Sequence, residues 1–142
     1  MADPKRIVFE LVSPERLLLS RPVDMVVVPG TEGLFGVLAG HSPLISTLKP
    51  GVIEVHEDGQ VIDRIFVAGG FAEVVPERCV VLAELATPVA ELDRAQVTER
   101  IAALEAEAGP AAHAPRPAPE GAVYDELTVS RAMLAAIEQR AA

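Results

Sequence analysis

The sequence contains one cysteine, no tryptophan, one tyrosine and four phenylalanines among its 142 residues. A single cysteine, Cys79, excludes a disulfide framework and a cysteine-ligated zinc site. It lies in the apolar run RCVVLAELA, which favours a buried small side chain over a reactive thiol. Because aromatic residues are scarce, the core must be built from Val, Leu, Ile and Ala, and a stacking surface for carbohydrate is not expected.

Basic residues are also few, because 12 Lys and Arg stand against 21 Asp and Glu and give a formal net charge of −9. The deficit holds along the chain, with 7 basic and 12 acidic residues in 1–86, and 5 and 9 in 87–142. We therefore expect no segment to bind nucleic acid or anionic lipid through charge alone.

Long apolar runs are absent as well. Charges interrupt every apolar run in residues 1–20, so no secretory signal is predicted there. No later run approaches the roughly 20 apolar residues of a membrane-spanning helix. These observations predict a soluble protein of the cytoplasm.

What the first part of the chain does contain is many short apolar runs, rich in β-branched residues and separated by Gly, Pro or Asp. Such spacing without intervening helical segments predicts an antiparallel sandwich or barrel, because parallel strands would need crossover helices. An Asp58-Gly59 turn predicts one hairpin over 51–68. The predicted strands are 5–12, 15–20, 22–28, 33–38, 51–57, 60–68, 70–75 and 78–86.

The periodicity changes at Thr87. With Thr87 as N-cap, Pro88 in the first turn and Gly109 as the stop, the pattern predicts a helix of about 21 residues. A Pro/Ala-rich connection follows at 109–121, and a second helix is predicted from residue 123 onward. The expected apolar faces are Val97, Ile101, Leu104 and Ala108 on the first helix, and Tyr124, Leu127, Leu134 and Ala141 on the second. The two helices should form an antiparallel hairpin.

The glycine-rich stretch PGTEGLFGVLAGHSPL, residues 29–44, is the most distinctive local motif. A phosphate-binding loop would need Gly-Lys-Ser/Thr at the start of a helix, but Gly40 is followed by His41 and Ser42. A metal site would need companions for His41, and the other two histidines do not provide a ligand cluster. Ser42 beside His41 is also no nucleophile elbow. Spacing and composition thus argue against an enzyme, and the glycines are compatible with turns that need a positive φ.

Several motifs in the right order resemble one family. The segments VVVPGTEGLFGVLAGHSPLISTLKPGVIEV, FVAGGFAEV and CVVLAELA are similar to the ε subunit of F-type ATP synthases, the counterpart of the mitochondrial δ subunit. The resemblance implies an antiparallel β-sandwich of about ten strands over 1–86. It also implies an antiparallel two-helix hairpin over 87–142.

The same resemblance implies a non-catalytic rotor subunit of the central stalk (F1 sector), which takes part in ATP synthesis and hydrogen ion transport. It implies contact with the membrane c-ring through Glu32, Gly33 and Leu34, with Leu34 standing where many relatives carry an acid. The implied contacts with the γ subunit fall on Ser13, His41 and Ser46. The implied location is the cytoplasmic face of the bacterial inner membrane, as a peripheral part of the complex, and no cofactor is implied.

In the family the helical hairpin can reach the α/β catalytic head and inhibit ATP hydrolysis, and some relatives bind ATP there. This sequence keeps Leu92, Asp93 and Arg131 of the ATP-binding motif, but Gln96 and Val97 replace its Arg-Ala pair. From residue 123 onward the net charge is −1. Without a positive cluster we expect weak or no ATP binding, and weak inhibition.

Two other interpretations stay open on the sequence alone. One is a stand-alone β-sandwich binding module with a helical tail, which the scarcity of aromatic residues disfavours. The other is an enzyme centred on His41, in which His41→Ala would abolish turnover.

Overall fold

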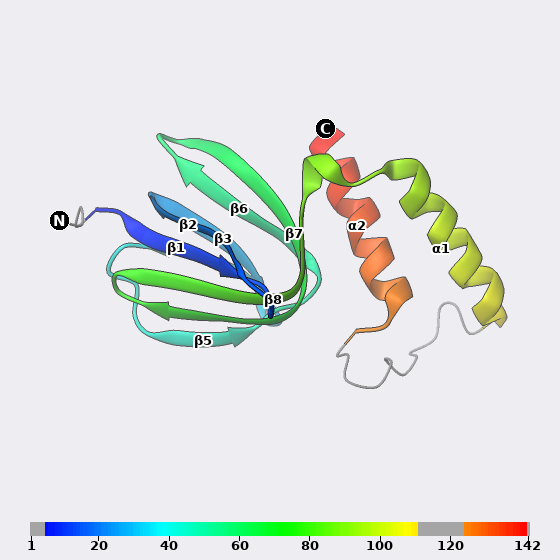
Figure 1. Cartoon of the computed structure of the whole chain (residues 1–142), viewed down its shortest axis with the longest axis horizontal. Helices are drawn as coiled ribbons and strands as arrows, with labels where there is room; N and C mark the ends of the chain where they lie inside the picture. Colours follow the sequence, from blue (N-terminus) through cyan, green and yellow to red (C-terminus); the bar gives the residue numbers. More distant parts are fainter. Residues whose placement is uncertain (1–4, 111–123, 142) are drawn as a thin grey trace.

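The computed structural model describes residues 5–110 and 124–141 of the chain. Eight strands are followed by one short 3-10 turn and two helices (Figure 1). The strands are β1 Ile7–Val12, β2 Leu17–Val23, β3 Met25–Gly30, β4 Gly33–Leu38, β5 Leu44–Thr47, β6 Gly51–Glu57, β7 Gln60–Val75 and β8 Arg78–Pro88. The remaining elements are the turn η1 Val89–Glu91 and the helices α1 Arg94–Ala108 and α2 Glu126–Ala141.

The eight strands form one continuous hydrogen-bonded sheet that folds over on itself. Its order is β2-β1-β8-β7-β6-β3-β4, with β5 added on β7. The first part of β7 pairs with β6, whereas residues 71–74 of the same strand pair with β5. The long strands β7 and β8 therefore pass from one layer to the other. The prediction of a β-sandwich followed by two helices is confirmed, with eight strands among the described residues instead of about ten. The predicted strands 60–68 and 70–75 are one strand, and β5 was not predicted.

One strand pair departs from the expected antiparallel arrangement. Strands β1 and β8 run parallel, with Val8 opposite Arg78 and Val12 opposite Leu82. The argument that parallel strands would need a crossover helix does not apply here. The connection between these two strands contains six other strands, so the chain has ample length to return in the same direction.

The passage of β7 between the layers depends on glycine at position 70. The ladder between β7 and β8 is interrupted at one position, because Gly69 and Glu84 do not pair, while Ala68–Leu85 and Gly70–Ala83 on either side keep the same register. Gly70 has a φ of 104°, and a Cβ atom there would collide with the carbonyl oxygen of Leu82. Only glycine satisfies both conditions, so the bend is fixed by the backbone at this position.

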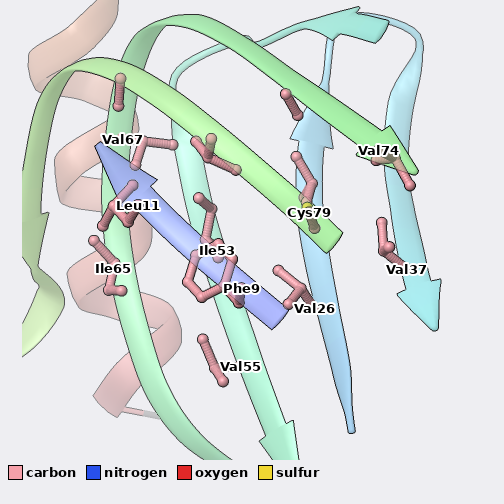
Figure 2. Packing of buried hydrophobic residues seen from close by; sticks show 14 of the residues in the cluster. Phe9, Leu11, Val26, Val37, Ile53, Val55, Ile65, Val67, Val74 and Cys79 are labelled. Carbon is pink, nitrogen blue, oxygen red and sulfur yellow. The ribbon is translucent and has the colours of Figure 1, made fainter. Parts of the chain in front are cut away.

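The space between the layers is filled by aliphatic side chains, as the composition predicted (Figure 2). Alternate residues of β1 point inward, and Ile7, Phe9 and Leu11 are all buried. Cys79 is completely buried in the same cluster, as expected. Other members of this core are Val26, Val37, Ile53, Val55, Ile65, Val67 and Val74.

The first helix begins later than predicted. Thr87 and Pro88 pair with Phe66 and Ile65 and are the last residues of β8, so Thr87 is not the N-cap. Pairing with a strand far away in sequence outweighs the local helix signal at these positions. The helix α1 has 15 residues instead of about 21, and it ends at Gly109 as predicted.

The helix α2 lies between the sandwich and α1 (Figure 1). Leu127 is buried and Leu134 is half-buried, as expected for the predicted face, whereas the side chain of Ala141 lies outside the described residues. A second face of α2 was missed, which packs on the outer side of β6 and β7. The cluster there consists of Phe66, Ala68, Val89 and Ala136, with Val52, Leu92, Val129, Ala132 and Met133 around it. The hairpin is therefore seated against the sandwich.

Ion pairs join the two helices. Arg100 makes a two-pronged contact with Glu126 at 2.6 and 2.8 Å. The other pairs are Arg131 with Glu105 at 3.1 Å, and Arg94 with Glu138 at 3.5 Å. The predicted connection at 109–121 falls largely on residues 111–123, which lie outside the described part of the chain.

Candidate protein-binding surfaces

The β3–β4 turn, which we take to include the first two residues of β4, holds Glu32, Gly33 and Leu34 at one end of the sandwich. Its base is tied to β5, because the Thr31 amide donates to the Thr47 carbonyl at 3.0 Å. Gly33 has a φ of 131° with no atom within 4 Å of its missing side chain. Leu34 is 68% exposed. The structure thus presents an exposed apolar side chain on a fixed turn.

Ser46, on β5, lies next to this turn. A hollow of about 560 Å³ separates the turn from β5, and both Ser46 and Leu34 line it. Ser46 is paired with the buried Ala72, so its side chain points toward the inner side of the layer. Its neighbour Ile45 points outward and is 69% exposed. Residues predicted for two different partners therefore meet at one hollow.

The layer formed by β2, β1, β8, β5 and the second half of β7 carries a row of apolar residues on its outer face, beside the charged residues Glu10, Glu73 and Arg78. Its outward residues follow one row across neighbouring strands, because Leu17 pairs with Val12, Val12 with Leu82, and Leu82 with Phe71. Leu17 is 56% exposed and Phe71 is 39% exposed. The two helices pack against the other layer, so within the described residues this outer face has no cover. We call this row, together with Ile45, the outer apolar face.

Ser13 and His41 lie at opposite ends of this layer. Ser13 follows Val12 in the β1–β2 turn, where its amide donates to the Arg16 carbonyl at 2.9 Å. His41 lies beside the β7–β8 turn, because the neighbouring Gly40 amide donates to the Pro76 carbonyl at 2.7 Å. Four residues of strand, about 13 Å, separate the two ends. The structure does not gather Ser13, His41 and Ser46 into one cluster.

The sequence could not indicate the outer apolar face. Its members come from five strands, and their outward direction depends on registers that no local pattern contains. Ile45 was missed because the four-residue strand β5 is too short to show alternation.

The residues that this chain shares with the ATP-binding motif of some relatives, Leu92, Asp93 and Arg131, all make contacts within the fold. Asp93 caps α1, with Oδ1 accepting from the amides of Ala95 and Gln96 at 2.9 and 3.3 Å. Leu92 packs against the cluster beneath α2, and Arg131 contacts a glutamate of α1. The structure does not gather these three into one basic site.

The ionisable groups show few unusual environments. Burial raises the pKa of the Cys79 thiol to about 12. His41 Nδ1 lies 2.7 Å from the carbonyl oxygen of the adjacent Ser42. Among the described residues, no three His, Cys, Asp or Glu side chains are arranged to hold a metal ion. Across residues 5–110 and 124–141, the helices are too short or too polar to cross a membrane.

Comparison with solved structures supports the fold. A chain of the mitochondrial ATP synthase of Euglena gracilis, solved with OSCP, F1 and the c-ring, superposes with a TM-score of 0.75. The match covers 100% of this chain and 85% of that one, at 24% identity. A chain of the central stalk and c-ring of the Tetrahymena thermophila mitochondrial ATP synthase matches with a TM-score of 0.54 at 12% identity, covering 99% and 100%.

Comparison of sequences identifies the family. The model of the ATP synthase delta/epsilon chain β-sandwich domain matches residues 6–89. The ATP synthase epsilon chain of Granulibacter bethesdensis is 57% identical over 97 residues, 68% of this chain and 72% of that one. The epsilon chain of Rhodospirillum rubrum is 58% identical over the same shares of both chains. With a sandwich and a helical hairpin of the matching kind, this chain belongs to the ATP synthase delta/epsilon chain family.

Proposed function

We propose that the chain is a rotor subunit of the central stalk, which couples rotation of the c-ring to ATP synthesis through the γ subunit. Its relatives are epsilon chains of ATP synthases, and one structural neighbour belongs to a central stalk and c-ring assembly. The observation that carries the proposal is the pair of exposed apolar surfaces on the sandwich, which the chain's own helices leave uncovered. A coupling subunit needs two such contacts and no catalytic group or cofactor.

The β3–β4 turn is the proposed contact with the c-ring. Leu34 is 68% exposed, and Glu32 and Gly33 precede it in the hairpin. Backbone bonds to β5 hold the turn in place, so force on the turn is passed to the sandwich. Because Leu34 is apolar, this contact buries apolar surface rather than forming an ion pair.

The outer apolar face is the proposed contact with γ. Ser13 and His41 lie at the two ends of this layer. Phe71 belongs to the apolar row, and Ile45 lies on the neighbouring strand β5. Apolar side chains that are exposed on neighbouring strands commonly mark a protein interface. Ser46 would act through the hollow below the β3–β4 turn, where the two proposed contacts adjoin.

The helical hairpin is proposed to inhibit ATP hydrolysis only weakly and to bind ATP weakly or not at all. In the seated hairpin Arg94, Arg100 and Arg131 all contact glutamates of the opposite helix. These arginines are then not available to an acidic surface of the catalytic α and β subunits. As part of such a complex the chain would lie at the cytoplasmic face of the bacterial inner membrane, attached through its partners.

Copurification with γ and with a c-ring preparation tests both contacts. Leu34→Lys should abolish binding to the c-ring and leave γ binding intact, whereas Phe71→Lys should abolish γ binding. Val61→Lys is a matched control, because Val61 is as exposed as Phe71, at 39%, but lies outside both surfaces. Ser46→Trp should weaken both contacts by filling the hollow between them. Full binding of both partners by all of these variants would contradict the assignment of the surfaces.

Deletion of the hairpin tests the proposal of weak inhibition. The deletion should begin at residue 93, because Thr87 and Pro88 belong to β8 and Val89 is buried on the sandwich. We expect ATP hydrolysis by the assembled complex to change less than about twofold. A twofold change corresponds to only about 0.4 kcal/mol in the activation free energy. A several-fold rise in hydrolysis would show that the hairpin is a strong inhibitor.

A further inference from the structure

A second hollow shares no lining residue with the hollow at the β3–β4 turn and has no part in the function proposed above. It has a volume of about 510 Å³ and opens where the β1–β2 hairpin approaches the start of β7 and the end of β8. Its floor is apolar, because Leu11 and Ile65 belong to the core and Leu19 and Ala86 pack against it. This volume is within the range of about 300 to 1,000 Å³ typical of small-molecule sites. An apolar group placed here would be buried against the existing core.

Three charged side chains from different elements border this hollow. Arg16 comes from the β1–β2 turn, Asp63 from β7 and Glu91 from η1. Within residues 5–110 and 124–141, none of these three side chains makes an ion pair or hydrogen bond. Elsewhere on the sandwich, by contrast, several charged side chains form ion pairs. An apolar floor with unpaired charges at its rim is the arrangement expected of a binding site for an amphiphilic molecule.

The charges at the rim decide which kind of molecule fits. Two carboxylates stand against one guanidinium, and the surrounding residues 1–86 carry 12 acidic against 7 basic residues. The local potential therefore attracts a cation and repels an anion. Asp63 is half-buried, so its charge is less screened than that of a fully exposed side chain.

We propose that this hollow binds a small organic cation with an apolar body. Its charged group lies near Asp63 and Glu91, and its apolar body lies on Leu11, Leu19 and Ile65. This proposal does not depend on the chain's role in the central stalk, because it rests on this hollow alone.

Binding in this hollow should also affect η1, the segment that connects the sandwich to the helical hairpin. Glu91 is the last residue of η1, which joins β8 to α1. Asp63 lies on the sandwich, so a cation that contacts both carboxylates ties η1 to β7. Bound cation should therefore slow amide hydrogen exchange at η1 as well as at β7.

Binding can be measured with three probes that share one apolar body. Octylammonium, octanol and octanoate are titrated, below their micelle concentrations, into the full chain while methyl NMR signals of Leu11, Leu19 and Ile65 are recorded. We expect saturable shifts with octylammonium, several-fold weaker binding of octanol, and the weakest binding of octanoate. Octanoate binding as tightly as octylammonium, or no saturable shift with any probe, would overturn the proposal. This comparison needs only the natural protein.

Charge variants then test the assigned residues. The double variant Asp63→Asn, Glu91→Gln should weaken octylammonium binding roughly threefold to tenfold, in keeping with partly exposed charge pairs. Arg16→Gln should strengthen it, because a like charge is removed. Glu99→Gln is the control, since Glu99 is exposed on α1 and does not line the hollow. Equal affinity of the double variant and the natural protein would place the cation elsewhere and overturn the site.

Discussion

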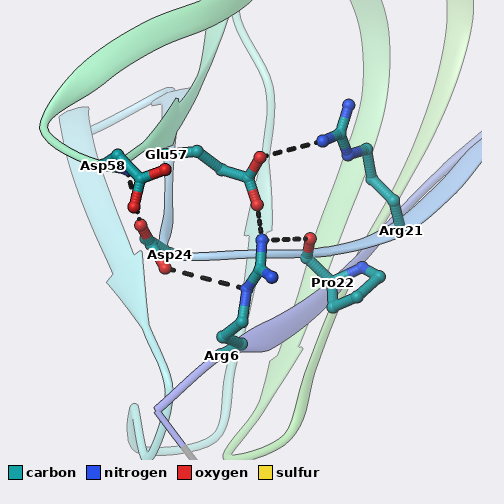
Figure 3. Close-up of polar contacts among 6 residues, drawn as sticks. All are labelled: Arg6, Arg21, Pro22, Asp24, Glu57 and Asp58. Atoms are coloured by element: carbon teal, nitrogen blue, oxygen red, sulfur yellow. Dashed lines mark hydrogen bonds and ion pairs between the residues drawn. The ribbon is translucent and has the colours of Figure 1, made fainter. Parts of the chain in front are cut away.

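Arg21 on β2 and Glu57 at the end of β6 form an ion pair, with Nη2 of Arg21 2.9 Å from Oε2 of Glu57 (Figure 3). Arg6 contacts the other oxygen of the same carboxylate and donates to the carbonyl of Pro22. The Glu57 side chain is only 17% exposed. Because β1 and β2 belong to one layer and β6 to the other, this carboxylate joins the two layers.

Removing the charge of Glu57 should therefore destabilise the sandwich. In Glu57→Gln, Arg6 and Arg21 face each other without a carboxylate between them, which should cost about 1 to 3 kcal/mol in the free energy of unfolding. Urea denaturation measures the change. Glu99→Gln, an exposed helix position, should stay within about 0.5 kcal/mol of the natural protein. Equal stabilities of these two variants would mean that the cluster contributes nothing.

Alanine should be tolerated far less at Gly70, in the bend of β7, than at Gly59 in an exposed turn. Gly70→Ala places a Cβ against the carbonyl oxygen of Leu82 at a φ of 104°, so we expect a loss of more than about 3 kcal/mol, or no folded protein. Gly59→Ala at a φ of 75° has open space and should cost only about 1 kcal/mol of backbone strain. Soluble yield and urea midpoints distinguish the two. Similar, small losses at both glycines would contradict a backbone-fixed bend.

Asp93 should behave as a helix cap. Asp93→Ala should reduce the free energy of unfolding of the hairpin by about 1 kcal/mol, because two amides lose their acceptor. Asp93→Asn keeps an acceptor oxygen and should cost much less. Helical circular dichroism during thermal unfolding reports the effect. A larger loss with Asn than with Ala would instead point to a need for the negative charge.

The pair Arg100–Glu126 should make the hairpin sensitive to acid. The hydrogen bond from Arg100 lowers the pKa of Glu126 below its ordinary value. A lowered pKa in the folded state means that the stabilisation is present above the ordinary glutamate pKa and is lost as the pH falls through the lowered one. The stability difference between the natural protein and Arg100→Gln should thus vanish in acid and shrink in high salt. A difference that does not change with pH would rule out the ion pair as its source.

Cys79 should report global unfolding. Its thiol is buried, and its pKa is raised to about 12, so the reactive thiolate is scarce in the folded protein. A raised pKa gives stability that is present below the ordinary thiol pKa and is lost as the pH rises above it. Alkylation at pH 8 should therefore be slow in buffer and fast in denaturing urea. Rapid labelling of the native protein would show local opening around β8.

Much of the fold could be predicted because its signals are local. The pattern of apolar runs placed β4 and β6 to the residue and the start of β1 to within two residues. The turn at Asp58-Gly59 adopts positive φ values of 51° and 75°. Gly109 ends α1 because it adopts a φ of 59°, which glycine tolerates.

The surfaces could be predicted only in part. The glycines predict a turn in this stretch, and the family resemblance pointed to Glu32 to Leu34, whereas the outward direction of Ile45 and Phe71 depends on pairing between β5 and β7. The inward direction of Ser46 is fixed by the same register. A single strand carries no information about which of its faces will meet another layer.

The sequence by itself determined the strand-rich first part, the helical end, the aliphatic core and the turns, because side-chain period and backbone preference act within a few residues. Tertiary structure decided that β8 continues through Thr87 and Pro88, that β1 runs parallel to β8, and that α2 sits between the sandwich and α1. These outcomes depend on hydrogen bonds and apolar burial between segments far apart in the chain, where partners compete and local preference is too weak to choose among them.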